Sequence, residues 1–111
     1  MTRQEYLALN STATDTFALH REYFAQFVTP ELKAIVRGAF GLDRLLSSND
    51  KYFNDIPLIR WDALHTRVPN SVFSAIKASG DVNAKTLSNS VCVLKEVARQ
   101  LVEEARAEQT I

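Results

Sequence analysis

The chain has 111 residues, of which 46% are hydrophobic and 23% charged, a composition typical of a globular protein and not of a disordered one. Thirteen basic residues balance thirteen acidic ones, so no net charge attracts the protein to nucleic acid or to an anionic membrane. A lone cysteine, Cys92, excludes an intrachain disulfide, and no apolar run approaches the roughly 18 residues of a membrane span. We therefore expect a cytoplasmic protein that folds as a single all-helical domain over residues 1–111.

The first third of the chain predicts three helices. Thr2 and Glu5 have the spacing of a capping box, which predicts a short helix through about residue 9. Thr12 and Asp15 repeat that spacing before a second helix over about 13–28. The aromatic face predicted for this second helix contains Phe17, His20, Phe24 and Phe27, with Leu19 and Tyr23 beside it. A third helix is predicted to begin at Thr29-Pro30-Glu31, because threonine caps a helix and proline fits its first position.

The middle of the chain predicts shorter helices separated by turn residues. Leu42, Leu45 and Leu46 indicate one short helical piece, and the polar run from Ser47 to about Asp55 indicates a loop. Pro57 opens a predicted helix through about His65, and a further short helix, capped by Asn70 or Ser71, ends at Ser79-Gly80.

The last stretch, from Leu87 to Ala105, organises the prediction. Apolar residues recur alternately four and three positions apart, which places them on one stripe of a long helix. These residues are Leu87, Val91, Leu94, Ala98, Leu101 and Ala105. Polar residues, among them Glu96, Arg99 and Glu103, fill the opposite side, which we expect to face water and to allow an Arg99–Glu103 pair. The stripe is either covered by the chain's own helices, with the 13–28 helix as a good candidate, or forms the seam of a homodimer.

The sequence has no alternating run of β-branched residues, so we predict no strand. The fold class we expect is therefore all-α, a single irregular bundle of about six or seven helices with a long C-terminal helix.

One cluster has the composition of a protein-binding hot spot. Tyr52 and Phe53 lie in the polar loop, and Arg60 and Trp61, the only tryptophan, follow shortly after it. The alternative is that Phe53 and Trp61 anchor the loop to the core.

A basic middle region offers a second hypothesis, a DNA-binding regulator. Residues 32–95 carry nine lysines and arginines against five aspartates. The segment from Ser71 to about Ala98 invites comparison with a helix-turn-helix, with Gly80 in the turn and with Lys85, Ser88 and Asn89 available to face DNA. Polar residues at Asp81, Asn83, Thr86 and Asn89, where two docked helices need apolar ones, argue against it.

No residue pattern predicts catalysis, a metal site or a cofactor. His20 and His65 are 45 positions apart and have no ligand spacing around them, and we expect His20 to be a structural residue. His65 follows Asp62 by three positions, a spacing that an acid–base couple can have but that far more commonly gives local surface hydrogen bonding. Cys92 is expected to be an apolar filler on the last helix.

The sequence thus favours a small non-enzymatic protein–protein interaction protein, adaptor- or inhibitor-like, that acts through an exposed helical or loop face. The partner we expect is another protein, or a second copy of this chain bound through the stripe of the last helix. We expect no cofactor. Nucleic acid is the less favoured partner and a membrane is not expected.

Overall fold

The fold is all-α. A computed structural model describes residues 1–109, which form seven helices and contain no strand. The helices are α1 (Arg3–Asn10), α2 (Thr16–Ala25), α3 (Pro30–Phe40), α4 (Leu42–Leu46), α5 (Leu58–His65), α6 (Asn70–Ala78) and α7 (Leu87–Gln109). The predicted fold class and the long C-terminal helix are confirmed. None of these helices combines the length and the apolar character that crossing a membrane requires.

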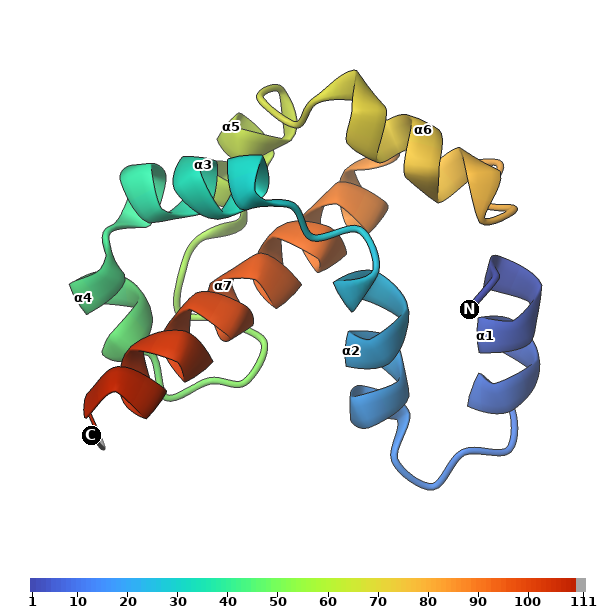
Figure 1. The fold of residues 1–111 in the computed structure, drawn as a ribbon, viewed down its shortest axis with the longest axis horizontal. Helices are drawn as coiled ribbons and strands as arrows, with labels where there is room; N and C mark the ends of the chain where they lie inside the picture. The colour runs from blue at the N-terminus through green and yellow to red at the C-terminus, as the bar shows by residue number, and fades with distance from the viewer. Residues whose placement is uncertain (110–111) are drawn as a thin grey trace.

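Helix α7 is the centre of the molecule. It runs diagonally through the view of Figure 1, with α1 and α2 to one side and α3, α4 and α5 to the other, and it packs against α2, α3, α4 and α5. Five residues of its predicted apolar stripe are buried, and Leu87 is half-buried against the core. The stripe is thus covered within one chain, so a homodimer would have to form through another face or by opening this fold.

The opposite side of α7 differs from the prediction. Glu96 and Arg99 were expected in water, but they are only 2% and 7% exposed. The reason is that α2 packs on this polar side of α7 and brings Arg21 against Glu96, with 3.0 Å between Nε and Oε1. Glu103 pairs with Arg21 as well, and Arg99 pairs with Glu96 instead of the predicted Glu103.

Some of the predicted helix N-caps are confirmed and others are wrong. Thr2 forms the predicted capping box with Glu5, and Thr29 caps α3 by accepting from the Leu32 N–H. The second predicted box is wrong, because Asp15 is itself the N-cap of α2 and accepts from the Ala18 N–H at 3.0 Å. Helix α6 also begins earlier than a cap at Asn70 or Ser71 would allow. Pro69 takes the N-cap position there.

The start of the N-terminal helix α1 contacts the end of α6. The Arg3 N–H donates to the Ser79 carbonyl at 2.8 Å, and the Tyr23 hydroxyl lies 2.9 Å from the Ser79 hydroxyl. Gly80, with a φ of +103°, then turns the chain into the connection that leads to α7. Tyr23 and Phe24 of α2 are buried in this region, as is Phe27, which follows the end of that helix. The helix predicted over about 13–28 is therefore shorter than expected.

Candidate functional site

The predicted hot-spot cluster is divided between the core and the surface. Phe53 and Trp61 are 4% and 1% exposed, and their ring centroids lie 6.3 Å apart. Tyr52 remains 37% exposed, and Arg60 is exposed. The two buried rings therefore fix the loop to the body of the molecule, while Tyr52 and Arg60 are the members that a partner could contact.

Phe53 has an unusual backbone. Among the described residues it is the only one other than glycine with a positive φ, 54°. The left-handed conformation is unfavourable for a bulky side chain and persists only where the surroundings enforce it. Here that conformation accompanies the burial of the Phe53 ring beside Trp61. The two neighbours of Phe53, Tyr52 and Asn54, stay exposed on the surface of the loop.

An exposed apolar pair follows the loop. Leu58 and Ile59, in the first turn of α5, are 61% and 76% exposed. Arg60 is held beside them, because its guanidinium lies 4.7 Å from the Phe40 ring centroid and its Nη2 donates to the Ala39 carbonyl at 3.1 Å. The start of α5 thus presents two aliphatic side chains and one positioned arginine on a helix that is anchored by Trp61 and Leu64.

A cavity of about 370 Å³ opens between α2, the loop and α7. Its apolar lining comes from Phe17, Leu45, Phe53 and Val102, and its polar lining includes Ser48 and Asn49. Its charged lining consists of Arg21, Lys51, Arg99 and Arg106 with Asp50 and Glu103. The lining thus has four cations and two carboxylates, and the buried Glu96 beside it compensates Arg21 and Arg99 in part.

Two of these arginines share one buried carboxylate. Glu96 Oε1 accepts from Arg21 Nε at 3.0 Å and lies 3.6 Å from Arg99 Nη1. The second distance is an ion pair but is too long for a hydrogen bond. Burial disfavours charge on Arg21, but its hydrogen bonds to Glu96 and Glu103 outweigh that effect and raise its pKa. For Arg99 burial prevails and lowers the pKa, against the attraction of Glu96.

The ring of Phe17, which lines the cavity, lies among charged side chains. The Arg99 guanidinium carbon lies 5.0 Å from the Phe17 ring centroid and the Lys51 ammonium nitrogen 4.6 Å from it. Tyr52 meets the same ring edge-on at 5.2 Å. Both cation distances are within the range of cation–π attraction, so Phe17 helps to position Lys51 and Arg99.

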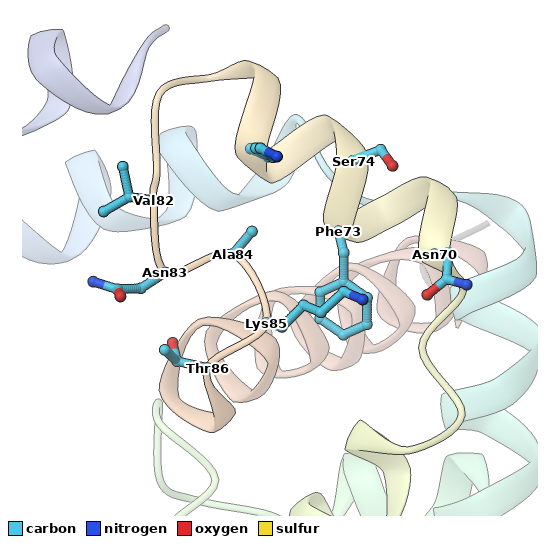
Figure 2. A pocket seen from close by; sticks show the side chains of 9 residues that line it. Asn70, Phe73, Ser74, Val82, Asn83, Ala84, Lys85 and Thr86 are labelled. Atoms are coloured by element: carbon cyan, nitrogen blue, oxygen red, sulfur yellow. The ribbon is translucent and has the colours of Figure 1, made fainter.

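A second hollow, of about 620 Å³, lies between α6 and the connection to α7. Figure 2 shows Phe73 projecting from α6 toward this connection. Val82 and Asn83 project from the side of the connection that faces away from Phe73 (Figure 2). Lys77 and Lys85 line the hollow and no acidic residue does. Of the residues expected to face DNA, Lys85 and Ser88 are exposed. Asn89 is buried and donates to Asp81 Oδ2 and to the Asn83 carbonyl, each at 2.8 Å.

The two histidines and the cysteine considered in the sequence analysis lie in different parts of the molecule. His20 is half-buried, with Nδ1 3.4 Å from the Tyr6 hydroxyl, and burial lowers its pKa. His65 Nδ1 is buried without a hydrogen-bond partner in the described part of the chain, and its ring packs on Phe73. Cys92 is half-buried, and burial raises the pKa of its thiol. Over residues 1–109 no three histidine, cysteine, aspartate or glutamate side chains are grouped to hold a metal ion.

Sequence reasoning missed the arginines of the cavity. The available signal was spacing, because Phe17 and Arg21 are four positions apart on α2, and Arg99 and Arg106 are seven apart on α7. Each pair therefore shares a helix face. Only the packing of α2 on the polar side of α7 brings the two faces together, and the apolar pattern does not reveal it.

In comparisons with known proteins, the chain matches no protein-family model, no curated protein and no solved structure.

Proposed function

We propose that this protein is a small non-enzymatic binding protein, adaptor- or inhibitor-like, that recognises another protein through the start of α5 and the loop before it. The observation that carries the proposal is the pair Leu58 and Ile59, two consecutive large aliphatic residues that are 61% and 76% exposed on an anchored helix. Exposed apolar side chains grouped on a rigid element are typical of interaction surfaces.

Neighbouring residues support the same surface. Arg60 is already positioned by Phe40 and by the Ala39 carbonyl, so little conformational freedom is lost when it binds. A cytoplasmic setting belongs to the proposal and agrees with the single, half-buried Cys92. The homodimer is the version of the proposal in which the partner is a second copy, and the solution mass by light scattering distinguishes the two versions.

The test places a photo-crosslinking amino acid at Ile59 and, as a matched control, at Val82, which is 92% exposed on another part of the surface. A protein captured at Ile59 is then purified and its affinity measured directly. Leu58→Ser with Ile59→Ser should weaken binding by tenfold or more, since each aliphatic side chain contributes roughly 1.5–3 kcal/mol when fully buried. Val82→Ser should leave the affinity unchanged. Equal loss in both variants would refute the proposed surface.

A second candidate function, nucleic-acid binding, is favoured by the hollow beside α6, where Lys77 and Lys85 have no acidic residue among the lining residues. Duplex binding through these two lysines should weaken as salt rises, with a log–log slope of roughly −0.9 for each phosphate contacted. Lys77→Gln with Lys85→Gln should remove it. A protein that does not retain duplex DNA in about 50 mM salt would exclude this function.

A further inference from the structure

The cavity between α2, the loop and α7 has two unlike parts. Arg21, Arg99 and Lys51 supply positive charge, while Leu45, Phe53 and Val102 supply an apolar surface. Its volume of about 370 Å³ lies at the small end of the range for ligand pockets, roughly 300–1,000 Å³. A bare inorganic ion would use only the charged part of such a space. A compact organic molecule with an anionic end would use both parts.

The charge of the ligand is inferred from Arg99. Its side chain is 8% exposed, and its Nε and Nη1 atoms are buried with no hydrogen-bond partner in the part of the chain that the structure describes. Its nearest carboxylate, Glu96, is already hydrogen-bonded to Arg21 and to Gln100. A buried cation that is so incompletely compensated is strongly attracted to an additional anion, because its field is little screened by water.

The rim of the cavity adds to this attraction. Lys51 and Arg106 are exposed and carry positive charge to the edge, whereas Glu103 is 56% exposed and is paired with Arg21. Lys51 is held over the rings of Phe17 and Tyr52, at 4.6 and 5.3 Å from their centroids. Lys51 and Arg106 therefore add positive charge to the lining of the cavity, which Asp50 offsets in part.

We propose that this cavity is a binding site for a small organic oxyanion, a carboxylate or a phosphate monoester attached to a compact apolar group. The oxyanion lies beside Arg99, between Arg21 and Lys51, and the apolar group lies against Leu45, Phe53 and Val102. The cavity shares the loop before α5 with the proposed protein-binding surface, but Leu58 and Ile59, the two residues that carry that surface, do not line the cavity. Either proposal can fail without the other.

The test uses benzoate and phenyl phosphate as probes, with neutral benzamide and inorganic phosphate for comparison. Binding is followed by changes in the amide NMR chemical shifts of the 111-residue chain. We expect benzoate and phenyl phosphate to shift the amides of Phe17, Lys51, Phe53 and Val102. Benzamide should bind at least about tenfold more weakly, a difference of about 1.4 kcal/mol, and inorganic phosphate more weakly than phenyl phosphate.

Variants locate the site. Arg99→Gln should weaken benzoate binding by about tenfold or more, since its charge is buried. Lys51→Gln with Arg106→Gln, a pair of exposed substitutions that keeps the test valid if Arg99→Gln does not fold, should weaken binding roughly two- to fivefold at each position. Lys85→Gln, on the other hollow, is the matched control and should change nothing.

Three outcomes would overturn the proposal. In the first, no probe shifts the cavity amides at concentrations up to about 10 mM, which corresponds to a binding free energy weaker than about −3 kcal/mol. In the second, benzamide binds as well as benzoate, so charge does not matter. In the third, an oligoglutamate peptide binds through these residues while benzoate and phenyl phosphate do not. The cavity would then receive an acidic side chain of a protein and not a small molecule.

Discussion

Replacing the buried carboxylate of Glu96 should destabilise the fold far more than replacing the cation it faces. Glu96 is 2% exposed, with Arg21 Nε at 3.0 Å and Arg99 Nη1 at 3.6 Å. Glu96→Gln preserves the shape of the side chain and removes its charge, so two guanidiniums then face a neutral amide. Breaking a buried ion pair in this way costs about 3–5 kcal/mol.

The low end of that range applies to this site. The side chain of Arg21 is 28% exposed and keeps Glu103 as a partner, so the loss falls mainly on Arg99, which is 8% exposed. A decrease of about 3 kcal/mol in the free energy of unfolding, at an m value of about 2 kcal/mol/M, lowers the urea midpoint by about 1.5 M. Equilibrium urea unfolding at neutral pH, followed by circular dichroism, measures this shift.

Arg99→Met supplies the contrast. Methionine replaces the apolar stem of the arginine and removes a buried charge that has incomplete compensation, while Glu96 keeps Arg21 and Gln100. We expect the free energy of unfolding to change by less than about 1 kcal/mol, and the double variant to be more stable than Glu96→Gln alone. A midpoint shift below about 0.5 M for Glu96→Gln, or an equal loss for Arg99→Met, would refute this account of the buried pair.

Three further predictions concern single residues. Burial and the neighbouring cations Arg99, Arg3 and Lys95 lower the pKa of His20 in the folded state. The unfolded chain then binds more protons near pH 6, so stability falls as pH drops from about 7.5 to 5.5, and urea unfolding at both pH values should show a smaller fall for His20→Gln. Burial likewise raises the pKa of the Cys92 thiol, so a thiol reagent should react much more slowly with the native protein than with the urea-unfolded chain. Trp61→Ala should lower the free energy of unfolding by about 3–5 kcal/mol, whereas Tyr52→Ala should lower it by only about 0.5–1.5 kcal/mol, which is the ring contact with Phe17; thermal denaturation separates the two.

Helix identity could be predicted from the sequence wherever local chemistry determines it. Thr29 and Pro30 mark the start of α3, and the apolar stripe of α7 is buried as its spacing predicts. In these cases the interactions lie within a few residues of each other along the chain. The packing partners are far apart, yet the stripe specifies only that something apolar must cover it.

The candidate cavity could not be predicted in the same way. It depends on Arg21 of α2 reaching Glu96 of α7, two residues that are 75 positions apart. A charged residue on the polar side of a helix usually predicts a solvated face, and that expectation failed at Glu96 and Arg99 because two helix faces with complementary charges packed against each other. The hot-spot cluster shows the same limit. Composition alone does not distinguish Phe53 and Trp61, which are buried, from Tyr52, which is not.

Stability alone does not account for an arginine at position 99. A methionine there would fill the space of the stem without removing a guanidinium from water, and buried ion pairs replaced by apolar residues of similar volume are often neutral or more stable. The Nε and Nη1 atoms of Arg99 find no acceptor among the described residues, so the fold does not use the hydrogen bonds that this side chain offers. An anion in the adjoining cavity would use its charge. Arg99→Met therefore separates the two roles: unchanged stability together with lost benzoate binding would assign the arginine to the cavity, whereas a loss of stability would assign it to the fold.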